Sequence, residues 1–68
     1  MTLSEFVKEK RRINSLTQQD LAEKAGVGLR FIRELEQGKQ TLRLDKVNQL
    51  LKLFGFEIAA VPLNRKDL

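Results

Sequence analysis

Apolar residues recur at helical spacing from Leu3 to Phe54, and only short polar or glycine-containing stretches interrupt them. The first segment follows Thr2, which forms a T-x-x-E capping box with Glu5. Cations crowd its far end, where they suit the negative end of a helix dipole. We therefore expect a first helix that begins at Leu3 and ends near Asn14 and Ser15.

Three further helices are predicted by the same spacing and by the glycines that follow them. Thr17 can cap the second helix, with Asp20 at its third position. Glycine is favoured where a chain turns left-handed after a helix, and one stands at the end of each segment. The expected helices are one from Thr17 that stops at Gly26, one from Leu29 to Glu36 that ends by Gly38, and one from Leu44 to Phe54 that closes at Gly55.

After Gly55 the pattern changes to strict alternation, which is typical of one short strand over residues 56–62. A lone strand in a helical chain has no partner for its backbone groups, so the same strand of a second copy is the economical partner, antiparallel across a two-fold axis. The expected dimer interface consists of Phe56, Ile58, Ala60 and Val61. A short fifth helix or a frayed end is the alternative, and residues 63–68 are expected to form a polar tail.

The length of 68 residues makes a partner subunit useful. The conformational entropy lost on folding costs roughly 1.5 kcal/mol per ordered residue, which nearly cancels the stabilisation that one small hydrophobic core provides. The sequence contains no Cys and no His, so disulfides and the usual metal ligands are missing, and we expect neither a metal nor a cofactor. Oligomerisation is the remaining source of stability.

Composition also limits the chemistry of the chain. Without His, Cys, Tyr or Trp, the common general base and the strongest nucleophile are missing, so we expect no catalytic residues and no enzyme activity. No apolar run approaches the ~20 residues of a membrane span, which predicts a cytoplasmic protein without a membrane partner. The 13 Lys and Arg against 9 Asp and Glu give a charge of +4, which suits a polyanion. The basic residues from Lys8 to Arg12 suggest a membrane-surface protein as an alternative. This alternative is weaker, because the apolar residues are expected to pack between the four helices and so are not free to enter a membrane.

Residues 18–35 resemble the helix-turn-helix of the Cro and phage-repressor superfamily, often called Xre-type. The matching residues are Gln18, Leu21, Ala22, Gly26, Val27, Ile32 and Leu35, followed by Glu36, Gly38 and Lys39. Ala22 is small where the two helices of the motif cross, and Gly26 takes the turn. The resemblance implies an all-α, four- to five-helix DNA-binding domain over residues 1–55. A generic helical hairpin with coincident spacing is the alternative.

The resemblance further implies that the second helix of the motif lies in the DNA major groove, where its outward residues read bases. These are Leu29, Arg30, Arg33 and Glu34. Either arginine could donate to guanine, Glu34 could accept from cytosine N4, and Leu29 could touch a thymine methyl. On an exposed helix, Arg33 and Glu34 could instead pair with Glu36 and Arg30, respectively.

A second group of residues is implied to bind DNA phosphates, from the start of the motif and from the loop after the recognition helix. Its members are Thr17, Gln18, Gly28, Lys39, Gln40, Thr41 and Arg43. Family members often carry Ser or Thr where this chain has Gly28, so a side-chain cap or contact is missing there. Arg11 matches a family position whose arginine pairs with the glutamate corresponding to Glu36, which implies a structural ion pair.

Residues 53–62 are similar to the helix-then-strand ending of HipB-like antitoxins. In that branch the strand pairs between subunits, and the dimer both represses its own operon and binds a HipA-like kinase toxin. The resemblance therefore implies a homodimeric repressor on an inverted-repeat operator in double-stranded DNA, and the autoregulating antitoxin of a type II toxin-antitoxin operon. A phage- or prophage-type regulator with no toxin partner is the alternative.

Overall fold

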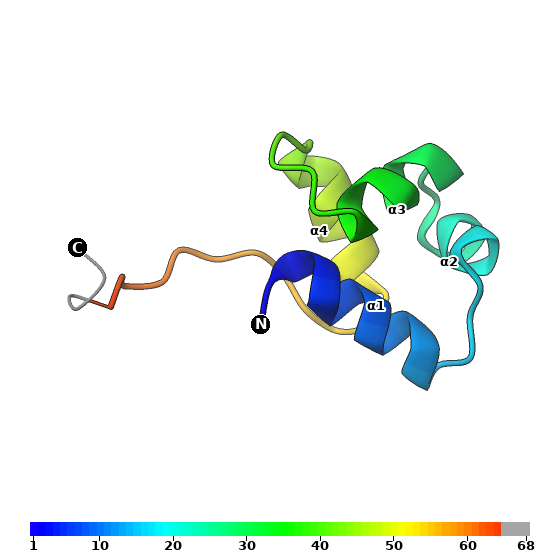
Figure 1. Cartoon of the computed structure of the whole chain (residues 1–68), viewed down its shortest axis with the longest axis horizontal. Coiled ribbons are helices and arrows are strands. Elements are labelled where there is room, and N and C mark those ends of the chain that lie inside the picture. The colour runs from blue at the N-terminus through cyan, green and yellow to red at the C-terminus, as the bar shows by residue number, and fades with distance from the viewer. Residues whose placement is uncertain (65–68) are drawn as a thin grey trace.

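Four helices form the body of the chain in the computed structural model, which describes residues 1–64 (Figure 1). They are α1 (Leu3–Ile13), α2 (Gln18–Ala25), α3 (Leu29–Glu36) and α4 (Leu44–Lys52). Residues 1–64 contain no strand, so the prediction of an all-α domain is confirmed. None of these helices has the length and apolarity that crossing a membrane requires.

The first two helices begin with the same device, and both predicted starts are confirmed. The backbone N–H of Glu5 donates to the Thr2 hydroxyl at 3.2 Å, and the Glu5 carboxylate accepts from the backbone N–H of Thr2 at 3.0 Å. Thr17 and Asp20 repeat this reciprocal pair, with both distances 3.0 Å. These backbone hydrogen bonds lower the pKa of each carboxylate below its ordinary value. Each box satisfies donors that a helix start otherwise leaves unpaired.

The turn between α2 and α3 is fixed by Gly26 and by a side chain of α4. Gly26 has φ 73°, the left-handed conformation that glycine adopts without strain. A Cβ at this position would lie only 2.9 Å from Nε2 of Gln49. That same nitrogen donates to the carbonyl oxygens of Ala25, at 2.9 Å, and Gly26, at 3.0 Å. The turn of the motif is therefore held against α4 as well as by its own geometry.

The core lies where all four helices meet. Its fully buried large side chains are Leu21, Ile32, Leu35, Leu50, Val7 and Val47. Burying one such side chain contributes about 1.5–3 kcal/mol. Because α3 supplies Ile32 and Leu35 to this core, its opposite face is turned to solvent.

The end of α4 differs from the prediction. The helix was expected to reach Phe54, but it ends at Lys52. The N–H groups of Phe54 and Gly55 donate three residues back, to Leu51 and Lys52, at 3.0 Å each, which tightens the chain into a turn. Gly55, at φ 82°, then reverses the chain.

Residues 56–64, here called the C-terminal arm, form neither the predicted strand nor the alternative fifth helix in the single chain. Several contacts attach the start of the arm. The Phe56 N–H donates to the Leu51 carbonyl at 3.0 Å, the Phe56 ring meets Phe6 edge-to-face with centroids 4.9 Å apart, and the Ile58 N–H donates to Oδ1 of Asn48 at 2.8 Å. Lys10 Nζ lies 5.6 Å from the centroid of the Phe6 ring and 5.3 Å from that of the Phe56 ring, within the range of a cation–π contact. Beyond these contacts the arm leaves the body (Figure 1). A strand needs a second strand to pair with, and residues 1–64 offer none; the remainder of the predicted polar tail, residues 65–68, lies outside the described residues.

Candidate nucleic-acid interface

Helix α3 divides sharply into a buried face and a basic outward face. Ile32 and Leu35 are 0% and 1% exposed, whereas the Arg30 side chain is 92% exposed. Arg33 is also exposed, and no carboxylate of residues 1–64 pairs with it. The buried face therefore fixes the direction in which the two arginines project.

The start of α3 is open, and the residue that begins it is less exposed than expected. Gly28 is the N-cap without a side-chain hydrogen bond, and a Cβ there would meet nothing within 4 Å. Space around the first backbone N–H groups suits an anion. Leu29, predicted to read a thymine methyl, is half-buried and packs against the core. The structure thus places Leu29 at the margin of the outward face.

Glu34 holds two cations at once. Its Oε1 accepts from Arg30 Nε at 2.9 Å, one helical turn away, and its Oε2 accepts from Lys39 Nζ at 2.8 Å. Hydrogen bonds from Lys39 and from Arg30, in that order, lower the pKa of Glu34. The contact between Arg30 and Glu34 matches the alternative to base reading by Glu34. The contact between Lys39 and Glu34 was not predicted from the sequence.

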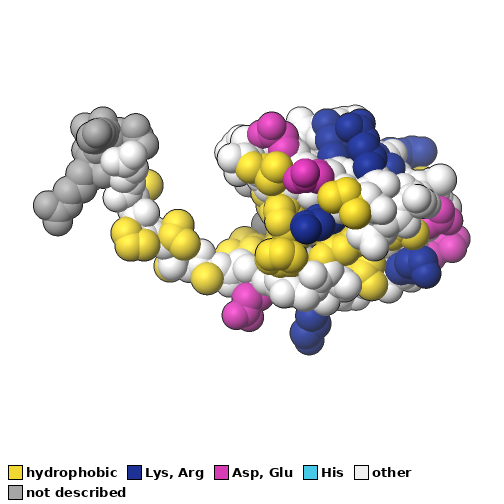
Figure 2. Space-filling view, turned by 90° about the horizontal axis from the view of Figure 1, so that it is seen from below, with side chains coloured by type: hydrophobic (Ala, Val, Ile, Leu, Met, Phe, Trp, Pro, Cys, Tyr) yellow, Lys and Arg dark blue, Asp and Glu magenta, His cyan; other side chains and the backbone are white. Residues whose placement is uncertain are grey.

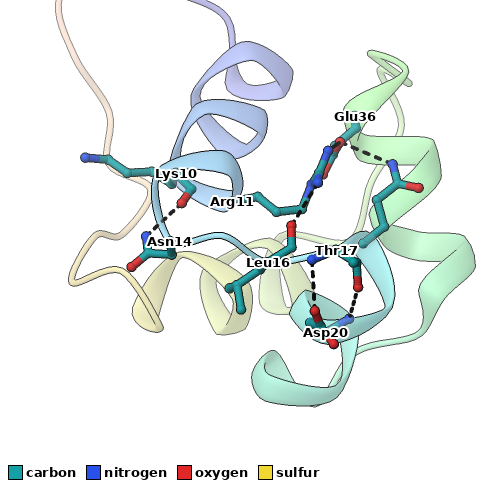
Figure 3. Close-up of polar contacts among 8 residues, drawn as sticks. Lys10, Arg11, Asn14, Leu16, Thr17, Asp20 and Glu36 are labelled. Atoms are coloured by element: carbon teal, nitrogen blue, oxygen red, sulfur yellow. Dashed lines mark hydrogen bonds and ion pairs between the residues drawn. The ribbon is translucent and has the colours of Figure 1, made fainter.

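A buried polar network ties α3 to the first two helices (Figure 3). Arg11 binds Glu36 through two parallel contacts, Nε to Oε2 at 2.8 Å and Nη2 to Oε1 at 3.0 Å, and its Nη1 donates to the Leu16 carbonyl at 3.0 Å. The two charged side chains are only 15% and 2% exposed. The hydrogen bonds to Glu36 raise the pKa of the Arg11 guanidinium further. The structure thus brings Arg11 and Glu36 together, and this excludes the alternative pairing of Arg33 with Glu36.

Gln18 joins the same network, which the sequence did not predict. Its Nε2 donates to Glu36 Oε1 at 3.2 Å, and the residue is half-buried. The predicted phosphate ligand therefore also orients the acid at the end of α3. Thr17, its neighbour in the predicted phosphate group, uses its hydroxyl to cap α2.

The loop after α3 presents the remaining predicted phosphate ligands. Gln40 and Thr41 are exposed. Arg43 precedes α4 and binds Asp45 through Nε at 3.1 Å and Nη2 at 2.6 Å. The hydrogen bonds from Arg43 lower the pKa of Asp45. Since both side chains are about two thirds exposed, at 67% and 65%, this pair is weakly held and Arg43 can exchange its partner for a phosphate.

The comparisons with known proteins agree with this geometry. A family model described as a helix-turn-helix domain matches residues 4–62. The uncharacterized HTH-type transcriptional regulator y4mF of Sinorhizobium fredii is 50% identical over 48 residues, which are 71% of this chain and 63% of that protein. The match thus spans less than two thirds of that relative's length. The family and the relative are both named for the helix-turn-helix motif, which α2, the turn at Gly26 and α3 form here.

Proposed function

This chain belongs to the helix-turn-helix domain family, and we propose on that basis that it is a sequence-specific DNA-binding regulator of transcription. The proposal rests above all on α3, whose buried Ile32 and Leu35 leave Arg30 and Arg33 projecting from the opposite face. An arginine so placed can donate two hydrogen bonds to O6 and N7 of a guanine in the major groove. In this proposal α3 is the recognition helix, which lies in the major groove and reads the bases.

Phosphate contacts on both sides of α3 would fix its register on the duplex. The open N-terminus at Gly28 supplies backbone N–H groups, and Gln18 retains amide capacity beyond its single bond to Glu36. On the other side lie the exposed side chains of the loop, Lys39, Gln40, Thr41 and Arg43. Such contacts give affinity without sequence preference, which leaves specificity to the arginines of α3.

We propose further that the regulator is a homodimer paired through residues 56–62. Val61 and Ile58 of the arm are 79% and 37% exposed, and Figure 2 shows apolar side chains along the arm and on the adjoining face of the body. Backbone N–H and C=O groups of successive residues in a strand point to opposite edges, so residues two apart share an edge. Because the Ile58 N–H is turned toward Asn48, the edge of Glu57, Ala59 and Val61 is left for a partner strand. Two recognition helices roughly 34 Å apart would then meet successive major grooves.

Replacing Ile58 by Lys tests this dimer. A charge on the pairing segment should yield monomers in sedimentation, and operator affinity should fall by about 100-fold or more because the two half-sites are no longer linked. Ile13→Lys is the matched control, because Ile13 is 66% exposed at the end of α1, away from the arm. An Ile58→Lys protein that sediments as the same dimer would place the interface elsewhere, with α4 as the alternative.

The biological role proposed is repression of its own operon in the cytoplasm, as the antitoxin of a type II toxin-antitoxin pair. Support for the antitoxin role comes from the similarity of residues 53–62 to HipB-like antitoxins. An adjacent reading frame for a HipA-like kinase, whose product co-purifies with this chain, is the expected finding. A gene that stands alone or in a phage immunity region would favour a regulator without a toxin partner.

A further inference from the structure

The three arginine–carboxylate pairs within residues 1–64 differ in how much of each guanidinium they use. Arg11 and Arg43 each bind their carboxylate with both Nε and Nη2. Arg30 binds Glu34 with Nε alone. The contrast shows that a single-point contact is not the default for an arginine in this fold.

Lys39 contacts the same carboxylate. Its Nζ donates to Oε2 of Glu34 at 2.8 Å and so competes with Arg30 Nη2 for the oxygen that a two-point pair would use. Both terminal nitrogens of Arg30 are without a partner among residues 1–64, on a side chain that is 92% exposed. The guanidinium contacts Glu34 through its inner nitrogen, and its outer edge is open.

We propose that Glu34 is a positioning residue for Arg30, which it holds by Nε so that the Nη1 and Nη2 edge meets O6 and N7 of a guanine. Lys39 maintains this arrangement by capping the second carboxylate oxygen. Glu34 then contributes to specificity through Arg30 and contacts no base itself, in contrast to the cytosine contact implied by the family resemblance. This inference rests on the proposed DNA-binding function.

Two physical effects follow from the arrangement. An anchored arginine loses less conformational freedom on meeting its base than an unanchored one. The negative charge of Glu34 also disfavours phosphate and so weakens binding to DNA that lacks the right guanine. Glu34 thus raises the ratio of operator to non-operator affinity in two ways: it strengthens binding to the operator and weakens binding to other DNA. Arg33, which has no carboxylate partner among residues 1–64, lacks this restraint.

Glu34→Gln in the chain of 68 residues tests the proposal. The probes are an operator duplex obtained by selection with the wild-type protein and a scrambled duplex of the same composition. The operator-to-scrambled affinity ratio should fall by about tenfold, with stronger binding to the scrambled duplex and a salt dependence that is steeper by about one phosphate contact per subunit. Lys39→Met should also weaken the preference for the guanine, because Arg30 Nη2 then has no competitor for Oε2 of Glu34 and a two-point pair is favoured. Glu9→Gln, with the same charge change on an exposed residue of α1, should leave the ratio unchanged.

Affinity for operators changed one base pair at a time separates positioning from direct reading. If Glu34 positions Arg30, then Glu34→Gln and Arg30→Ala relax the same guanine, and in the Arg30→Ala background the second substitution has no further effect there. Two results would overturn the inference. One is a loss of base preference in Glu34→Gln at a different base pair, as expected if Glu34 itself contacted a cytosine. The other is affinity losses of the two substitutions that add in the double variant. If the wild-type protein selects no operator, the proposed function fails instead. If it selects one and Glu34→Gln keeps the same base preferences, only this inference fails.

Discussion

Replacing Arg11 by Met is expected to lower the free energy of unfolding by about 3 kcal/mol, because it leaves Glu36 charged and buried without its main partner. A neutral Gln18 amide at 3.2 Å cannot replace two charged hydrogen bonds. Small domains have little stability to spare, so thermal unfolding followed by circular dichroism should show the midpoint falling by more than about 10 °C.

The neighbouring residue provides the control. Arg12 is exposed and forms no ion pair within residues 1–64, so Arg12→Met should leave the midpoint nearly unchanged. The double variant Arg11→Met, Glu36→Leu removes both charges and should recover much of the loss, since no buried charge then lacks a partner. Equal midpoints for Arg11→Met and Arg12→Met would refute the role assigned to this network.

Arg30→Ala is expected to produce a large loss of affinity that is specific to the operator. A good arginine–guanine pair is worth about 1–3 kcal/mol, and the proposed dimer would make two, so operator affinity should fall at least about 30-fold. Binding to a scrambled duplex should fall much less, because only charge is lost there. Fluorescence anisotropy at one fixed salt concentration measures both.

Arg12→Ala removes the same charge from α1 instead of α3. It should reduce operator affinity by no more than about threefold, as expected for a charge that touches no base. An equal loss for Arg12→Ala and Arg30→Ala would mean that net charge, and not the outward face of α3, determines binding.

The helices of this fold could be predicted because their boundaries are encoded locally. Thr2 and Thr17 each carry a complete capping box in the sequence, and Gly26 occupies the left-handed turn. The end of α4 was missed because Leu53 and Phe54 continue the apolar spacing although the backbone has already turned. Spacing reports which face is apolar, and it does not report where the backbone stops being helical.

The candidate site was predictable only in part, because helical spacing fixes the direction of helix residues and not that of loop residues. The outward position of Arg30 follows from helical periodicity around Ile32. The capture of Glu34 by Lys39 does not, because Lys39 lies in a loop where no periodicity fixes its direction. The bonds of Gln49 to the turn and of Asn48 to the arm likewise depend on segments brought together only in the folded chain.

Selection from a pool of random duplexes tests the central claim most directly. We expect enrichment of an inverted repeat whose half-sites lie one helical turn apart, about 10 base pairs, each with a guanine whose preference is lost in Arg30→Ala. A selection at low salt that enriches no sequence for the wild-type protein would contradict the claim that α3 reads DNA.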